Sequence, residues 1–223
     1  MIASVAHTYA AIADEFSRTR YNHWNKVKQF IESLDKYTIL LDCGCGNGKY
    51  TNVRSDLVYI GCDITNELLQ HANTAKSGDS MKDLFQVSCE NLPVRTNSVG
   101  AVICIAVLHH IASFEARVNV VIGLLKSLEP DGLAMITVWA YEQTNTKKRD
   151  TKWERISPFT TDYLIPWRGA NLRFYHLFTH TEVEELCKSV CMAMRDSAIA
   201  LSYTIEFELD NWVITWKKKL INN

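Results

Sequence analysis

The sequence has few prolines and glycines, four and nine, and no two of its seven cysteines form a C-x-x-C pair. The missing pair excludes the common zinc-knuckle and dithiol redox motifs, and the odd number of cysteines argues against a complete disulfide set. We therefore expect buried free thiols, no metal site and a reducing location, cytosolic or nuclear.

Long apolar runs and an excess of one charge are also missing. The longest apolar stretch, residues 101–108, is far shorter than the about 20 residues that span a bilayer. The N-terminus lacks the basic segment and apolar run of a signal peptide, so we expect no membrane contact. Lys and Arg number 24 against 25 Asp and Glu, which excludes a surface adapted everywhere to phosphate but permits a local basic patch.

Short apolar runs alternate with amphipathic stretches along the chain. They predict strands at 38–41, 57–62, 83–87, 99–108 and 133–139, and helices at 21–34, 65–74, 113–128 and 181–193. This alternation predicts an α/β fold with a doubly wound, mostly parallel sheet and helices on both faces. Stretches at 199–201 and 203–216 add an antiparallel C-terminal edge, which makes seven strands. We expect one domain over 1–223, with a helical N-terminal segment at 1–36 and a mobile basic loop at 142–161.

A cluster of glycines follows the first predicted strand. Gly44, Gly46 and Gly48 alternate with other residues directly after Asp42. This spacing is neither the dinucleotide fingerprint nor a P-loop, and the leading acid suits a ligand with a cationic end. Asp63 lies 21 residues further on, at the tip of the second strand, where a doubly wound sheet places a carboxylate for ribose hydroxyls.

Over about residues 38–140 these features resemble the class I S-adenosylmethionine-dependent methyltransferases. The resemblance implies S-adenosyl-L-methionine as cofactor, with Asp42 at its amino-acid end and Asp63 at its ribose. The cofactor-binding candidates in the loop are Gly44, Cys45, Gly46 and Gly48. Ser88 stands where relatives usually carry an aspartate for the adenine amino group, and a neutral hydroxyl accepts that bond more weakly. We therefore expect Ser88 and Cys89 near the adenine, together with backbone groups and apolar walls.

Two adjacent histidines end the fourth predicted strand, where the methyl group would emerge. Side chains alternate along an extended chain, so we expect one of His109 and His110 to face the cleft and the other to pack. A histidine there suits a general base for a hydroxyl or amine acceptor, or a hydrogen-bond donor to an anionic acceptor.

A longer series of motifs extends over about residues 9–216. In chain order it comprises Thr19-Arg20-Tyr21-x-x-Trp24, Gly44-Cys45-Gly46-Asn47-Gly48-Lys49-Tyr50, Gly61-Cys62-Asp63, Val107-Leu108-His109-His110, Val138-Trp139-Ala140-x-Glu142-Gln143, Ile165-Pro166-Trp167, Arg173-Phe174-Tyr175-His176-Leu177-Phe178 and Asp210-Asn211-Trp212. The set resembles the eukaryotic tRNA wobble-uridine carboxymethyl methyltransferases. Several of these motifs lie outside anything the cofactor fold requires, which makes the resemblance specific.

The resemblance implies esterification of the 5-carboxymethyl group of the wobble uridine in tRNA. A carboxylate, with a pKa near about 4, is already ionised at neutral pH, so the enzyme must supply alignment and no catalytic base. Arg20 is the first candidate to hold that carboxylate, because a guanidinium fork matches its geometry; a surface ion pair is the alternative.

Other residues are candidates for the rest of the acceptor site. His109 or His110 would donate a second hydrogen bond to the carboxylate. Tyr175 and His176 would close the cleft, or have a structural role instead, and Trp139 would form part of the wall.

Contacts with RNA and with a partner are also expected. Lys147, Lys148 and Arg149, with other basic residues at 152, 155 and 217–219, would bind phosphates or form a solvated basic face. The resemblance implies the tRNA anticodon as substrate and a heterodimer with a small zinc-binding activator subunit docked along a sheet edge. The alternatives are a small-molecule methyltransferase of the same fold, active without RNA, and a non-catalytic scaffold.

Overall fold

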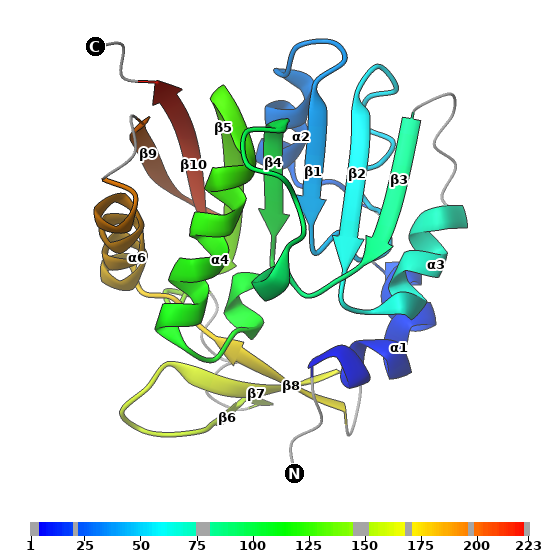
Figure 1. Ribbon diagram of the computed structural model, residues 1–223. Helices are drawn as coiled ribbons and strands as arrows, with labels where there is room; N and C mark the ends of the chain where they lie inside the picture. The colour runs from blue at the N-terminus through cyan, green and yellow to red at the C-terminus, as the bar shows by residue number, and fades with distance from the viewer. Residues whose placement is uncertain are drawn as a thin grey trace.

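The computed structural model describes residues 5–19, 22–74, 81–144, 152–167, 171–195 and 199–220, with a seven-stranded sheet at its centre. The strands are β1 (Ile39–Cys43), β2 (Val58–Asp63), β3 (Met81–Gln86), β4 (Val99–Ile105), β5 (Leu128–Trp139), β9 (Ile199–Glu208) and β10 (Asn211–Leu220). Their order is β3-β2-β1-β4-β5-β10-β9, so the chain winds outward from β1 in both directions (Figure 1). The order reverses between β1 and β4, the place where sheets of this kind bind their ligands.

The pairing of the strands confirms the predicted topology. β1 to β5 pair in parallel, β10 pairs antiparallel with β5, and β9 pairs antiparallel with β10. The sheet is therefore doubly wound and mostly parallel, with an antiparallel C-terminal edge, as the sequence predicts.

Helices cover both faces of this sheet. They are α2 (Asn25–Glu32), α3 (Asn66–Thr74), α4 (Phe114–Ser127) and α6 (His180–Ala193), whereas α1 (Val5–Thr19) lies at the carboxyl ends of the strands. Successive strand residues face opposite sides, so Leu40 packs in one core cluster with α2 and α3 and Leu41 packs in another with α4 and α6. Figure 1 shows α4 and α6 in front of the sheet and α2 behind it. Burial on both faces explains why the central strands are continuous apolar runs.

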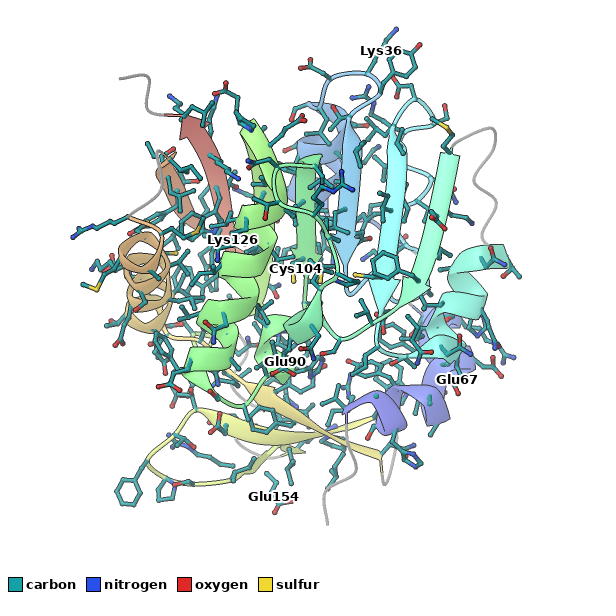
Figure 2. All side chains as sticks on the ribbon, viewed as in Figure 1. Lys36, Glu67, Glu90, Cys104, Lys126 and Glu154 are labelled. Carbon is teal, nitrogen blue, oxygen red and sulfur yellow. The ribbon has the colours of Figure 1, made fainter. Side chains whose placement is uncertain are left out.

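The cysteines contribute to this core. All seven are free thiols and five of them are buried. Cys104 of β4 lies inside the sheet in Figure 2, whereas the labelled charged side chains of Lys36, Glu67 and Glu154 lie at the rim. A hydrogen bond to Cys104, together with burial, raises the pKa of the Cys43 thiol well above its usual range. Within the described ranges no cluster of metal-ligating side chains is arranged to hold an ion, and no helix is long and apolar enough to cross a membrane.

A second sheet, which the sequence does not predict, lies at the carboxyl ends of the parallel strands (Figure 1). Its antiparallel strands are β6 (Glu154–Arg155), β7 (Asp162–Trp167) and β8 (Asn171–His176). β6 falls inside the segment 142–161 that was expected to be a loop, and residues 145–151 of that segment lie outside the described residues. β7 is hidden in the sequence because Pro166 interrupts it, and proline is rare in strands away from an edge or a bulge.

Two short 3-10 helices complete the surroundings of the site. η1 (Cys89–Asn91) follows β3 and η2 (Leu108–His110) follows β4. β8 contacts both η2 and α1, so the second sheet, the end of β4 and the N-terminal helix meet at one end of the molecule.

Candidate active site

A cavity of about 540 Å³ opens at the carboxyl ends of β1, β2, β4 and β5. This volume lies within the about 300–1,000 Å³ typical of small-molecule sites. Residues of α1, the loop after β1, η1, η2 and β8 also line it. The predicted site residues among them are Asp42, Gly44, Cys45, Gly46, Asp63, Ser88, Cys89, His109, His110, Trp139 and Tyr175. The structure thus brings together most residues that the sequence places in one site.

The loop after β1 depends on glycine at two positions for different reasons. Gly44 has a φ of +78°, and a Cβ there would lie 2.2 Å from Cγ2 of Val107. Gly46 has a φ of +54°, and a Cβ there would have no atom within 4 Å, so its Cα faces open space. The N–H groups of Gly44 and Cys45 donate to the Cys62 carbonyl at 2.7 and 2.9 Å, which fixes the loop against β2. The loop therefore presents backbone to the cavity with room for a ligand.

Asp42 and Asp63 place two carboxyl groups on this cavity. Burial raises the pKa of Asp42 to about 7, although the Tyr59 hydroxyl donates to its Oδ2 at 2.5 Å. Burial also raises the pKa of Asp63, while the N–H groups of Gly46 and Thr65 donate to its two oxygens at 2.9 and 2.8 Å and favour the ionised form. The Thr65 hydroxyl also donates to this carboxylate, and Asp63 lines the cavity, where it can accept from a ligand hydroxyl as well.

Neither of these carboxyl groups has a Lys or Arg partner in a salt bridge within the described residues. The cost of burying them is therefore only partly offset by the protein. A ligand with a positive charge would offset more of it.

Ser88 and Cys89 form the start of η1 at the edge of the cavity. The Ser88 side chain caps η1 by accepting a hydrogen bond from the Glu90 N–H at 3.3 Å. Burial raises the pKa of the Cys89 thiol to about 12, so this side chain is neutral. Ser88 thus already accepts one hydrogen bond within η1. An adenine ring bound here would contact mainly apolar side chains and backbone groups.

The hydrogen bonds of His110 fix its tautomer. Nδ1 lies 2.8 Å from the Phe174 carbonyl oxygen, which can only accept, so Nδ1 carries the proton. Nε2 then accepts from the Tyr9 hydroxyl at 3.0 Å. Burial lowers the pKa of His110 to about 4, so the ring is neutral and both nitrogens are already bonded.

His109 has the opposite tautomer. The Trp139 N–H donates to its Nδ1 at 3.4 Å, so the proton of the neutral ring is on Nε2. Burial lowers the pKa of His109 well below its usual range. The ring stacks on Tyr175 at a centroid distance of 4.7 Å, and within the described residues Nε2 has no acceptor. His109 therefore keeps a neutral donor, and His110 does not.

Some residues that sequence reasoning did not assign also lie on the cavity. Tyr9 and Arg173 line it beside the histidines, and Arg173 is only 4% exposed. Arg173 belongs to a motif that the sequence shows, but its position depends on contacts with Tyr9, which lies 164 residues away in the chain. Ala106 also lines the cavity, with a φ of +61° that side chains rarely adopt.

Two predicted site residues lie elsewhere. Gly48 does not line the cavity, and a Cβ there would lie 2.9 Å from Cβ of Ala72, so this glycine allows α3 to pack closely. His176 is likewise outside the cavity, and its Nδ1 bonds to Asp162 at 2.7 Å. Its Nε2 lies 3.5 Å from Glu182, so His176 joins β8 to β7 and α6.

Four further candidates, Arg20, Lys147, Lys148 and Arg149, lie outside the described residues. The basic residues at 152 and 155 are exposed, but Lys218 is buried at 1% exposure. The interpretation of Lys218 as a phosphate contact is therefore wrong, because strand alternation in β10 turns its side chain inward.

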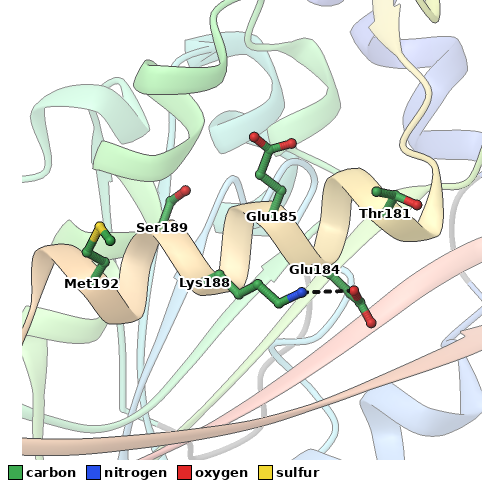
Figure 3. A pocket seen from close by; sticks show the side chains of 6 residues that line it. All are labelled: Thr181, Glu184, Glu185, Lys188, Ser189 and Met192. Carbon is green, nitrogen blue, oxygen red and sulfur yellow. Dashed lines mark hydrogen bonds and ion pairs between the residues drawn. The ribbon is translucent and has the colours of Figure 1, made fainter.

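A second hollow lies on the outer face of α6 (Figure 3). It measures about 330 Å³ and is lined by Thr181, Glu184, Glu185, Lys188, Ser189 and Met192. Lys188 pairs with Glu184 at 3.1 Å one helical turn away, and none of the predicted site residues is present. The hollow is a feature of an exposed helix face and is separate from the cavity.

The cavity fits S-adenosyl-L-methionine by the chemistry of its donor set. The cofactor carries a positive sulfur and a positive amino group, which suit carboxyls that have no salt bridge to Lys or Arg among the described residues. Its ribose hydroxyls suit the Asp63 carboxylate on the cavity wall, and the open space beside Gly46 accommodates a ligand close to the backbone.

Comparisons with known proteins agree with this fit. Residues 41–136 match the family model of the methyltransferase domain. A tRNA (carboxymethyluridine(34)-5-O)-methyltransferase of Arabidopsis thaliana is 38% identical over 165 residues, which cover 74% of this chain and 39% of that protein. The protein of the same name from Schizosaccharomyces pombe is 28% identical over 232 residues, 96% of each chain. The chain thus spans about two fifths of the Arabidopsis relative's length.

Solved structures show the same fold. A methyltransferase in complex with the Haloferax volcanii Trm112 methyltransferase activator matches with a TM-score of 0.68 and 13% identity, over 99% of this chain and 100% of that chain. The DhpI–SAH complex matches with a TM-score of 0.68 and 14% identity, over 98% and 97%. Residues 41–136 form a methyltransferase domain, and the chain is a homologue of proteins named tRNA (carboxymethyluridine(34)-5-O)-methyltransferase.

Proposed function

We propose that this chain transfers a methyl group from S-adenosyl-L-methionine to the carboxylate of 5-carboxymethyluridine at the tRNA wobble position and forms the methyl ester. The names of its relatives support this reaction. The observation that carries it is the polarity of the cavity, whose lining has the buried Asp42 and half-buried Asp63 carboxyls where β1 and β2 end, and Arg173 of β8 with the His109 donor of η2. Such a cavity suits a cationic donor and an anionic acceptor.

The cofactor supplies a methyl group on positively charged sulfur. Asp63 would hold the ribose hydroxyls, and Asp42 with the backbone of the glycine loop would hold the amino-acid end. Ser88 and Cys89 would lie near the adenine. With the cofactor held in this way, its methyl group would face the part of the cavity that η2 and β8 line.

Transfer to a carboxylate requires no proton movement. In the proposed transfer the acceptor oxygen would form a bond to the methyl carbon while the carbon–sulfur bond breaks, and sulfur would keep the electron pair. The neutral states of His109 and His110 agree with this chemistry, because neither ring is needed as a base. His109 would donate from Nε2 to the carboxylate, and His110 would position Tyr9.

The remaining acceptor and RNA contacts stay proposals from the sequence. Thr19 and Asn22, which flank the undescribed Arg20 segment, line the cavity, and this supports Arg20 as a second ligand of the carboxylate. Trp139 and Tyr175 would form the wall around the base. Lys147, Lys148 and Arg149 would contact phosphates near the anticodon.

We also propose a heterodimer with the small zinc-binding activator. The support is a structural neighbour solved with the Trm112 activator. β3 and β9 are the outer strands of the main sheet, and either edge offers unpaired backbone groups for an added strand.

Mass spectrometry of wobble nucleosides tests the proposed function. Unmethylated tRNA would be incubated with cofactor and chain, with and without the activator. Conversion of 5-carboxymethyluridine to its methyl ester is expected, most strongly with the activator. If no ester forms even with the activator present, the proposed function is wrong.

A further inference from the structure

Arg173 of β8 carries a buried positive charge that no described carboxylate neutralises. Its side chain is 4% exposed, and no salt bridge includes it within the described residues. Its Nε is buried and has no hydrogen-bond partner among the described residues. Guanidinium groups stay protonated in proteins, so Arg173 keeps a full charge that no anion of the described part of the chain pairs with.

Aromatic rings hold this guanidinium in place. Its central carbon lies 5.6 Å from the ring centre of Tyr9 and 5.0 Å from those of Trp167 and Tyr175. Such contacts orient a cation and lower its cost of burial, but they leave its hydrogen-bond donors free. Arg173 and two of these rings, Tyr9 and Tyr175, line the cavity.

A chain of hydrogen bonds fixes the group further. Nη1 of Arg173 donates to the Tyr9 hydroxyl at 3.1 Å, which donates in turn to His110 Nε2 at 3.0 Å. His110 is anchored by the Phe174 carbonyl at 2.8 Å. Each group has one consistent direction of donation, so the chain is satisfied up to Arg173 and ends at its unpaired Nε–H.

We propose that Arg173 binds the carboxylate of the methyl acceptor and selects an anionic carboxymethyl group over a neutral one. The inference rests on the proposed function and names the residue that recognises the negative charge of the substrate. An unpaired buried guanidinium binds a carboxylate with charge-assisted hydrogen bonds. A neutral amide in the same place would leave the positive charge of the guanidinium unpaired. Methyl transfer removes the negative charge of the acceptor, so the ester should bind weakly and leave.

The test compares labelled anticodon stem-loop RNAs that differ only at the wobble base. One carries 5-carboxymethyluridine, one the 5-carbamoylmethyl amide and one the methyl ester. Fluorescence anisotropy at fixed salt, with saturating S-adenosylhomocysteine, gives each affinity. The wild type should bind the carboxylate about tenfold or more tighter than the amide or the ester, as a charge-assisted hydrogen bond implies. Arg173→Met should bring this ratio close to one.

Controls separate this role from folding and from general attraction to RNA. Arg95→Met removes one exposed positive charge outside the cavity and should leave the ratio unchanged. Unchanged affinity for S-adenosylhomocysteine shows that a variant is folded. If Arg173→Met loses that affinity, Arg173→Gln, which keeps a donor for Tyr9, should lose the ratio instead.

A folded neutral variant that keeps the wild-type ratio would overturn the inference, and so would a wild type without a preference. A wild-type structure with S-adenosylhomocysteine and 5-carboxymethyluridine decides the point if neither variant folds. The carboxylate should lie within hydrogen-bond distance of Arg173, and any other location contradicts the role. Failure of the proposed function looks different, because the wild type would then form no ester.

Discussion

Asp42 illustrates how a single side chain prepares the cavity before a ligand arrives. Burial raises its pKa to about 7, from an ordinary value near about 4. Between these pH values the folded protein holds a proton that the unfolded chain has lost. Through this group, the unliganded protein therefore loses stability as pH rises from about 4 to about 7.

The same linkage predicts pH-dependent cofactor binding. A cationic ligand requires ionised Asp42, so affinity for S-adenosylhomocysteine, which keeps the positive amino group, should rise by up to about tenfold per pH unit below pH 7 and then level off. Calorimetric titration between about pH 5.5 and pH 8 measures this slope. Asp42→Asn keeps the shape of the side chain and should bind more weakly with little pH dependence. If Asp42→Asn keeps the pH dependence of the wild type, the proton released on binding comes from another group.

At the residue scale the sequence predicts the donor end of the site better than the acceptor end. Asp42 and Asp63 follow from local pattern, because each directly ends a strand. Arg173 does not, because its role comes from contacts with Tyr9, 164 residues away in the chain. The sequence places His109 and His110 at the site, but only their hydrogen-bond partners in the structure show which ring keeps an N–H for a ligand.

At the scale of elements, one buried lysine closes the end of α4. The Lys218 ammonium donates to Oδ1 of Asn97 at 2.7 Å and to the Leu125 carbonyl at 3.1 Å. Its third proton goes to the Leu128 carbonyl, and the Lys126 carbonyl lies 3.4 Å away. A positive charge at a helix C-terminus is favourable, and the Leu125 carbonyl is one that the last turn of α4 leaves unpaired.

Lys218→Met should therefore destabilise the fold. Loss of the donor leaves the buried Leu125 carbonyl without the ammonium, at a cost of about 2–3 kcal/mol and a fall of roughly 5–10 °C in Tm. Thermal denaturation followed by circular dichroism measures it. Lys217→Met, at an exposed position on the same strand, is the matched control and should change Tm little. Equal Tm values for the two variants would contradict the capping role.

Strands and helices are predicted where apolar residues follow a regular pattern, and they are missed where polar residues or proline interrupt that pattern. The central strands are found within a few residues because both of their faces are buried. α6 is found, but its capping box consists of Thr179 and Glu182, whereas the sequence places the start at 181. β7 is missed because Pro166 interrupts its apolar pattern, and β8 is missed because the buried Arg173 and His176 break the apolar pattern there.

The whole molecule carries almost no net charge, −1 with neutral histidines, so the proposed binding of RNA would depend on local basic groups. Binding of an unmodified anticodon stem-loop should weaken steeply as salt rises, with a slope set by the number of phosphates contacted. Anisotropy titrations over a salt series measure this slope. A small-molecule methyltransferase of the same fold would bind its acceptor almost independently of salt, and a flat series would favour that alternative.

The arrangement of the two sheets around one cavity leads to the most direct test. A crystal structure with bound S-adenosylhomocysteine should show its ribose hydroxyls on Asp63, its amino-acid end at the loop of Gly44 and Gly46, and its sulfur directed toward His109. If the molecule binds outside this cavity, or binds in it with the sulfur directed away from the histidine, the account of donor and acceptor ends is contradicted.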